Sequence, residues 1–270
     1  MNRKSSIRAI LLRKECLLFF LLLLPMFTKA QYNKVYADIT ANMLVDMGFE
    51  NVIWSEDEKE RVYVLENTPW RLQGVGLAHA IDRIQKTGLP EKGKSCRIVV
   101  LDNNIPQISL IYTANPDSLK AAPGSYAARS AWDATYDLGD SWDKVKKEYR
   151  MNSSLFKVVV YPELYLKNLI ITQIYQVLFN LSPAIEVSFW NGMKLTAQMV
   201  FPIYNDGYGP WAGKIHPGMV TLSQSFRLPY RTFARASIGL FNADRYGVDL
   251  AVTHHLKDER FSLEGRIGCT

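Results

Sequence analysis

Apolar and polar residues alternate along the second half of the chain. The positions between the apolar ones are mostly polar, as at Lys194, Thr196 and Gln198. A period of two over about ten residues predicts long strands with one apolar and one polar face. Tilted strands of about nine to eleven residues can cross the hydrocarbon of a bilayer, so the pattern favours the wall of a transmembrane β-barrel. The apolar positions are Leu195, Ala197, Met199, Phe201 and Ile203; Tyr246, Val248, Leu250, Val252 and Leu256; and Phe261, Leu263, Ile267 and Cys269.

The barrel-like region is expected over residues 156–270. Phe156 to Lys167 predicts its first strand, although Pro162 weakens the middle of that strand. The segment 169–181 is apolar at nearly every position, which fits either a strand or a helix lying at a membrane interface, and Ser182-Pro183 is expected to end it. We expect about eight strands in this region, all antiparallel.

A hairpin is the clearest local signal in this region. Asn191-Gly192 lies between the strands predicted over Ile185–Trp190 and Met193–Ile203. A two-residue connection of this composition favours a type I′ turn, because both residues tolerate a positive φ.

The connections between the predicted strands differ in length. Tyr204 to Pro217 holds three glycines and two prolines and predicts a long loop, whereas 228–230 and 257–259 predict tight turns. Long loops at one rim and short turns at the other are typical of outer-membrane barrels, as is a girdle of aromatic residues near the strand ends. The aromatic residues near strand ends are Trp190, Phe201, Tyr204, Tyr208, Trp211, Phe226, Tyr230, Phe233, Phe241, Tyr246 and Phe261.

A small α+β domain is predicted over residues 31–113. Its elements follow the order αββαββ, with Asp38 as the expected N-cap of the first helix and Gly48 at its end. The charged run from Glu56 to Glu60 predicts an exposed hairpin turn, and the two helices are expected to cover one face of a small sheet. Residues 114–155 are rich in turn signals and predict an irregular linker.

The first thirty residues have the features of a secretory signal peptide. A basic start precedes an apolar run, Cys16 to Phe27, and Thr28-Lys29-Ala30 is a small-x-small site. We expect cleavage after Ala30, because the apolar run is shorter than the ~20 residues of a membrane helix.

The leader also accounts for the basic charge of the chain. Its six Lys and Arg residues and one Glu supply five of the six net positive charges, so nucleic acid is not indicated as a partner. Cys96 and Cys269 are the cysteines left after the leader, and their spacing leaves a disulfide and two free thiols equally open.

The sequence indicates no catalytic, cofactor-binding or metal-binding residue. His254 and His255 are neighbours in a predicted strand and so face opposite sides, which excludes a metal pair. The acidic run at 56–60 could supply the two carboxylates of a glycosidase, although a solvated turn is the simpler interpretation. No cofactor is expected, and the chain is predicted not to be an enzyme.

Several segments resemble the YjbH-like family. They are the segment 43–52 (MLVDMGFENV), the segment 64–67 (VLEN), the segment 200–205 (VFPIYN), the segment 216–218 (HPG) and the segment 237–247 (SIGLFNADRYG). The resemblance implies an outer-membrane β-barrel with a periplasmic α/β domain, associated with secretion of exopolysaccharide or capsule in Gram-negative bacteria and without enzymatic activity. Members of that family have many more strands, and this chain ends without a terminal aromatic residue, so we expect a partial barrel whose remaining strands are encoded downstream.

The sequence therefore supports three alternatives. The first is an outer-membrane barrel protein, with its N-terminal domain in the periplasm and with lipid, polysaccharide and export proteins as partners. The second is a secreted, soluble β-rich module that binds glycans or proteins. The third, a periplasmic glycan-processing enzyme, depends only on the acidic run.

Overall fold

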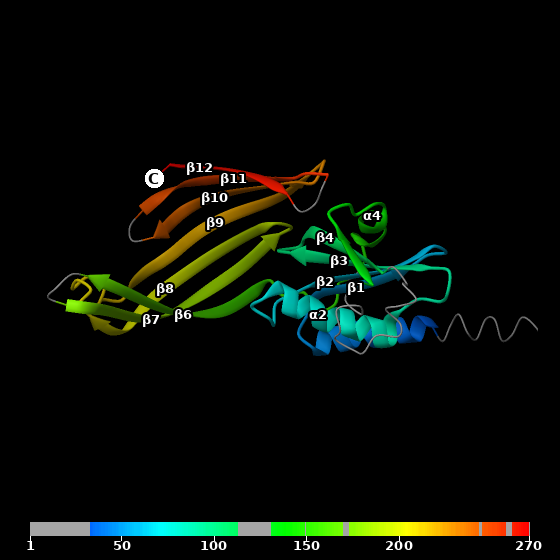
Figure 1. Ribbon diagram of the computed structural model, residues 1–270, viewed down its shortest axis with the longest axis horizontal. Helices are drawn as coiled ribbons and strands as arrows, with labels where there is room; N and C mark the ends of the chain where they lie inside the picture. Colours follow the sequence, from blue (N-terminus) through cyan, green and yellow to red (C-terminus); the bar gives the residue numbers. More distant parts are fainter. Residues whose placement is uncertain are drawn as a thin grey trace, which may run out of the picture.

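The computed structural model describes residues 33–112, 131–148, 150–169, 173–242, 245–257 and 261–269. The protein contains two β-sheets, a five-stranded sheet in the order β1-β2-β3-β4-β5 and a seven-stranded sheet in the order β12-β11-β10-β9-β8-β7-β6. The sheets follow one another along the long axis, and the helices lie beside the smaller one (Figure 1). We call residues 33–148 the small unit and strands β6 to β12 the large sheet. The predicted leader lies outside the described residues.

The small unit has the predicted αββαββ order. Only β2 and β3 are parallel, because the second helix crosses between them, and the other neighbouring strands are antiparallel. None of the described helices combines the length and the apolar character that a membrane span requires. The elements are a helix over 33–46, β1 (Glu50–Glu56), β2 (Glu60–Glu66), α2 (Gln73–Arg83) with the π-helical turn η1 (Ile84–Gly88), β3 (Ser95–Asp102) and β4 (Ile105–Tyr112).

The first helix differs from the prediction at its start. Because it occupies residues 33–46, Asp38 lies inside the helix and is not its N-cap. The Asp38 carboxylate instead accepts a hydrogen bond of 2.7 Å from the indole N–H of Trp54 on β1. Gly48 follows the end of the helix with a φ of +92°, as a C-terminal glycine was expected to do.

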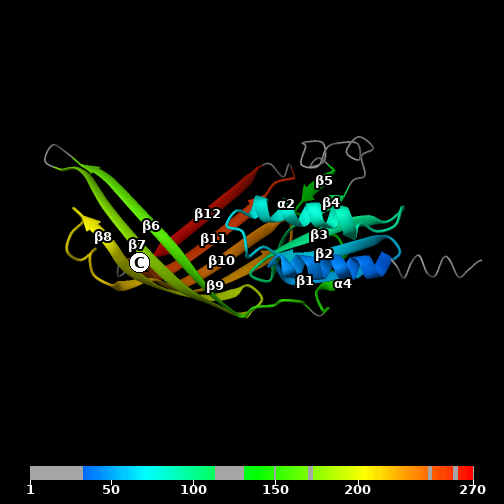
Figure 2. The same cartoon turned by 90° about the horizontal axis from the view of Figure 1, so that it is seen from below.

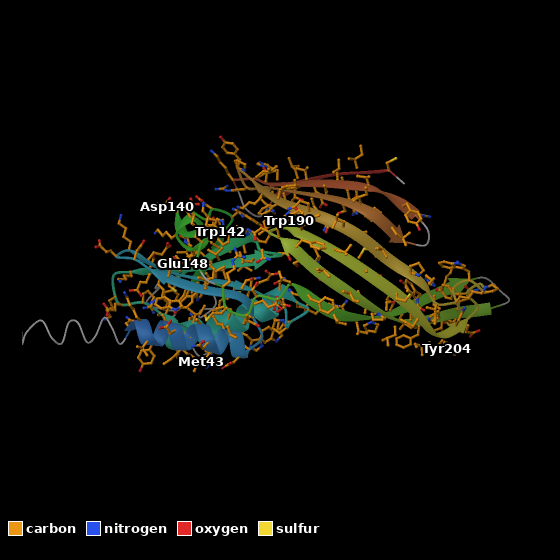
Figure 3. All side chains as sticks on the ribbon, turned by 180° about the vertical axis from the view of Figure 1, so that it is seen from behind. Met43, Asp140, Trp142, Glu148, Trp190 and Tyr204 are labelled. Atoms are coloured by element: carbon orange, nitrogen blue, oxygen red, sulfur yellow. The ribbon has the colours of Figure 1, made fainter. Side chains whose placement is uncertain are left out.

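Residues predicted to form a linker complete the small unit. Part of the 114–155 segment forms β5 (Trp132–Thr135), which pairs with β4, and the short helix α4 (Ser141–Val145). Leu138 and Val145 cover the sheet face opposite the two longer helices, against apolar side chains of β1, β2 and β3. Figure 3 shows Met43 on the helical side and Trp142 on the opposite side. Short elements of this kind are stabilised by packing and leave no periodicity in the sequence.

The large sheet is an antiparallel meander of very long strands. Each strand pairs with its neighbours in the chain. The strands are β6 (Phe156–Leu169), β7 (Gln173–Trp190), β8 (Met193–Asp206), β9 (His216–Leu228), β10 (Thr232–Asn242), β11 (Arg245–His255) and β12 (Ser262–Cys269).

The described strands of the large sheet number seven, not about eight, because β7 is one continuous strand. The prediction that Ser182-Pro183 ends a segment was wrong, and the described part of the ambiguous segment 169–181 is strand. The ladder between β7 and β8 is interrupted at these two residues, between the pairs Leu181–Phe201 and Ala184–Gln198. Pro183 therefore lies where its missing N–H removes no hydrogen bond to β8.

The two faces of the large sheet are inverted relative to a soluble protein. Leu250 and Ile238 on the apolar face are 47% and 56% exposed, whereas Asp249 and Thr196 on the other face are only 7% and 5% exposed. We call the second face the polar face. The predicted alternation is confirmed, and most of the large apolar side chains lie on the exposed apolar face.

The large sheet is curved but does not close. Figures 1 and 2 show it as an open, bent wall. Within the described residues β6 pairs only with β7 and β12 only with β11, so both edges are unpaired. Six successive antiparallel pairings make β6 and β12 run in the same direction. An entirely antiparallel closure would therefore need an odd number of further strands.

The aromatic residues and the connections at the ends of the strands agree only in part with the barrel rims that the sequence predicts. Trp190 and Tyr204 lie at opposite ends of the wall, as Figure 3 shows, and both are exposed. At the end away from the small unit, however, only the connection from Asp206 to His216 is long, because β10 and β11 are separated by two residues. The predicted turn residues 258 and 259 lie outside the described part of the chain.

The turn between β7 and β8 contacts the small unit. The predicted hairpin is confirmed, but only Gly192 has a positive φ (+82°), so the turn is not of type I′. The Gly192 N–H donates a 2.9 Å hydrogen bond to the carbonyl oxygen of Asn103, in the turn between β3 and β4. A Cβ atom on Gly192 would lie 2.3 Å from the carbonyl oxygen of Ser225.

Gly192→Ala should destabilise the protein, because its φ and the close approach of Ser225 both exclude a side chain. We expect a loss of about 1–3 kcal/mol in the free energy of unfolding, measured by urea denaturation. Gly265→Ala on β12 is the matched control, since a Cβ atom there would have no atom within 4 Å and the φ of Gly265 is not positive. Equal stability of the two variants would contradict the role of Gly192 in the junction.

Candidate functional site

A cleft of about 620 Å³ lies on the polar face, beneath the connection between β8 and β9. This volume lies in the range of small-molecule sites. Residues of β6 and β10 both line the cleft, although three strands separate them in the sheet, so the curvature of the sheet is what forms it. The residues that line it are Tyr161, Glu163, Tyr165, Leu178, Asn180, Ala184, Thr196, Gln198, Val200, Tyr208, Trp211, Ala212, His216, Gly218, Met219 and Phe241.

Hydrogen bonds hold the floor of the cleft in place. The side-chain amide of Gln198 donates to one carboxylate oxygen of Glu163 at 3.1 Å, and the hydroxyl of Tyr165 donates to the other at 3.2 Å. The amide oxygen of Gln198 accepts a hydrogen bond of 3.2 Å from the backbone N–H of Met219. These partners come from three strands, β6, β8 and β9, so the orientation of Glu163 and Gln198 is fixed by the sheet and not by local sequence.

Two polar atoms in this part of β7 have no hydrogen-bond partner. They are the side-chain oxygen of Asn180, which lines the cleft, and the hydroxyl of Ser182. Both residues are buried, at 4% and 0% exposure. An unpaired buried acceptor costs about 1–3 kcal/mol, so its presence in a cleft indicates a place where a donor can bind.

The roof of the cleft is an ordered loop. Asn205 accepts a hydrogen bond from the backbone N–H of Tyr208 at 3.1 Å, and the Lys214 N–H donates to the Trp211 carbonyl oxygen at 3.0 Å. The rings of Trp211 and His216 lie with their centroids 4.2 Å apart. Trp211 is 47% exposed, so part of its indole surface is available to a ligand.

A second set of contacts joins the large sheet to the small unit. Arg227 of β9 donates to the carbonyl oxygens of Pro106 and Gln107, at 2.9 and 2.8 Å, and to that of Tyr136. The Tyr136 ring stacks on His255 of β11 with centroids 3.8 Å apart. The orientation of the two parts is therefore set by hydrogen bonds as well as by chain connectivity.

A partly buried ion pair strengthens this junction. Lys157 of β6 lies 2.8 Å from a carboxylate oxygen of Glu50 on β1 and 3.8 Å from Glu66 on β2. Glu66 also accepts hydrogen bonds from the backbone N–H groups of Asn103 and Asn104. The end of the polar face that adjoins the small unit is thus charged and closely bound to that unit.

The acidic run at residues 56–60 is not a wholly solvated turn. Glu56 is paired with Arg61 and Lys94, and Glu60 with Arg97 at 2.8 Å. Glu60 is buried and the side chain of Glu56 is only 6% exposed, because their cationic partners come from β2 and from the β3 region, which the sequence did not place beside the turn. Glu60 also accepts a 2.6 Å hydrogen bond from Ser141 of α4.

Glu56 and Asp57 do not have the raised pKa of a glycosidase acid. Burial raises the pKa of Glu56, but hydrogen bonds from Lys94 and Arg61 outweigh burial and hold it below its usual value. Hydrogen bonds from Lys144 and from the backbone of Lys59 and Glu60 lower the pKa of Asp57 to about 2. A general acid needs a raised pKa, so this turn is better suited to stabilising the fold than to catalysis.

The histidines and cysteines do not form a shared site. His79 stacks on Trp70, and His254 contacts the hydroxyl of Thr232. In the described residues no group of His, Cys, Asp and Glu side chains could hold a metal ion. Cys96 is buried in the small sheet, where burial raises its pKa to about 12, while Cys269 is exposed on β12; both are free, so a disulfide between them is not formed.

Sequence reasoning did not single out the cleft. Tyr161, Glu163 and Tyr165 alternate with apolar residues along β6, and this was the signal that could have found its floor. The roof could not be found in this way, because the loop is brought over the sheet only by folding. Comparison with known proteins finds no family model, curated protein or solved structure that matches this chain.

Asp57 should contribute to stability only above its folded-state pKa. Because that pKa is lowered from 3.8 to about 2, the contribution is present at pH 7 and is lost as the pH falls from about 4 to about 2. Asp57→Asn should cost less than about 1 kcal/mol at pH 7, since the pair with Lys144 is partly exposed, and this cost should shrink to nothing as the pH falls through about 2.

Urea unfolding at several pH values tests this prediction. Lys144→Met should have a similar effect at pH 7, and the double variant should lose little more than either single variant. A cost of Asp57→Asn that grows as the pH falls would contradict the assignment.

Proposed function

We propose that the chain forms part of an outer-membrane β-barrel that serves secretion of exopolysaccharide or capsule and has no enzymatic activity of its own. The observation that supports this best is the inversion of the large sheet, in which most of the large apolar side chains lie outside and the polar side chains lie on the concave side. Water does not stabilise a wide apolar surface of this kind, whereas the hydrocarbon of a bilayer does.

The length of the strands supports the same proposal. β6 to β11 each have at least eleven residues, enough for a tilted strand to cross the hydrocarbon. Exposed aromatic residues at both ends, including Trp190 and Tyr204, would lie at the two interfaces. In this arrangement the small unit lies in the periplasm, in agreement with the predicted signal peptide.

The unpaired edges of β6 and β12 determine which further strands a closed barrel would need. In hydrocarbon the unpaired N–H and C=O groups of β6 and β12 would each cost several kcal/mol, so both edges need partner strands. Because the two edges run in the same direction, an odd number of additional strands would close an antiparallel barrel. The proposed role in polymer secretion rests on the resemblance to the YjbH-like family and on the polar concave face.

Substitutions on the two faces of the large sheet distinguish between a membrane-spanning sheet and a sheet of a soluble protein. Leu250→Arg should cost about 2–4 kcal/mol if Leu250 faces lipid, whereas an exposed position in water would tolerate it within about 0.5 kcal/mol. Ser223→Arg on the polar face of β9 is the control and should be tolerated better. The measurement is the stability of the detergent-refolded protein against urea. A tolerated Leu250→Arg would favour the soluble glycan- or protein-binding module.

Cell fractionation tests the location directly. The protein should remain with the outer membrane after carbonate washing, and it should migrate differently on gels before and after heating, because a barrel resists unfolding by detergent. Recovery in the soluble periplasmic fraction would overturn the proposed function. A variant without residues 1–30 should stay in the cytoplasm and serves as the control for the leader.

A further inference from the structure

We infer that the cleft on the polar face binds a neutral saccharide segment, held by aromatic stacking from its roof and by hydrogen bonds from its floor. The inference rests on the proposed function, since it names the chemical class of ligand that the concave face would contact.

The aromatic lining indicates a ligand with flat apolar faces. Tyr161, Tyr165 and Trp211 line the cleft and are 40%, 47% and 47% exposed. Tyr161 and Tyr165 come from β6, while Trp211 comes from the loop, so the rings approach the cleft from the floor and the roof. The C–H faces of a pyranose ring can pack on such rings while its edges remain polar.

The floor supplies hydrogen-bonding groups of fixed geometry. The side-chain oxygen of Asn180 is buried and unpaired, so it can accept a bond from a hydroxyl. Gln198 is already held at both ends, by Glu163 and by the N–H of Met219, so little conformational entropy is lost when a ligand binds beside it. Hydroxyl groups are both donors and acceptors, and they match such a mixed surface.

The charge of the lining decides between neutral and acidic sugars. Glu163 contributes a carboxylate to the cleft, and no Lys or Arg is among the described residues that line it. A uronate or phosphate group bound there would lie near a like charge without a Lys or Arg in the lining to offset it. A neutral saccharide has no such penalty, so the lining favours neutral over acidic oligomers.

Binding is tested with the purified protein and three probes: maltohexaose, cellohexaose and hexagalacturonate. The protein must be kept in a detergent without a sugar head group, such as lauryldimethylamine oxide, because alkyl glycosides would compete for the cleft. Calorimetric titration should detect binding of at least one neutral hexasaccharide, with hexagalacturonate binding about tenfold more weakly or not at all.

Two substitutions in the cleft and one outside it locate the site. Trp211→Ala and Asn180→Leu should each weaken binding about tenfold or more, through loss of stacking and of the acceptor. Trp190→Ala is the matched control, because Trp190 is exposed at the opposite end of the wall (Figure 3) and should leave binding unchanged. Thermal unfolding midpoints close to that of the unsubstituted protein show that each variant has folded.

The inference is overturned if none of the probes binds, if the acidic hexamer binds best, or if the folded cleft variants bind as well as the control. Flotation of the same preparation with lipid vesicles is scored separately. Lipid association without saccharide binding would reject the site and leave the proposed function standing. Saccharide binding without lipid association would support the site and reject the membrane wall.

Discussion

The pairing of backbone groups between long antiparallel strands is the interaction on which the large sheet depends. In soluble proteins a sheet is held against a core by its apolar face, but here that face is on the outside. The concave side contains small and polar residues such as Thr196 and Asp249, which cannot provide a comparable hydrophobic core. The ladders from β6 to β12 must therefore supply most of the cohesion, and the surroundings of the apolar face must supply the rest.

The small unit, in contrast to the large sheet, is held together by buried apolar side chains. Its sheet is covered on one face by two helices and on the other by the α4 segment, so its apolar side chains are buried on both sides. Its most deeply buried charged side chain, that of Arg61, is paired with Glu56. Arg227, Lys157 and the turn at Gly192 attach the large sheet to this unit, and the unit thereby fixes the position of one end of the polar face.

The cleft depends on the shape of the large sheet and on the loop that follows β8. Curvature of the sheet brings β6 and β10 to the same concavity, and the loop after β8 places Trp211 over it. A closed eight-stranded barrel would fill such a space with side chains, whereas an open or wider wall leaves it accessible. The polar residues that make the sheet unsuitable as a soluble core are the same ones that make its concave side suitable for a hydroxyl-rich ligand.

The sequence by itself determined the features that depend on local pattern. The period of two predicted the strands and their two faces, Gly48 and Asn191-Gly192 predicted a helix end and a hairpin, and the αββαββ order was recovered in full. Tertiary structure decided what depends on residues distant in the chain. Packing made β5 and α4 part of the small unit, an interrupted ladder let Pro183 remain inside β7, and cationic partners from β2 and the β3 region paired with Glu56 and Glu60. The cleft belongs to this second group, because neither the curvature of a sheet nor the position of a loop over it is encoded in the period of a single strand.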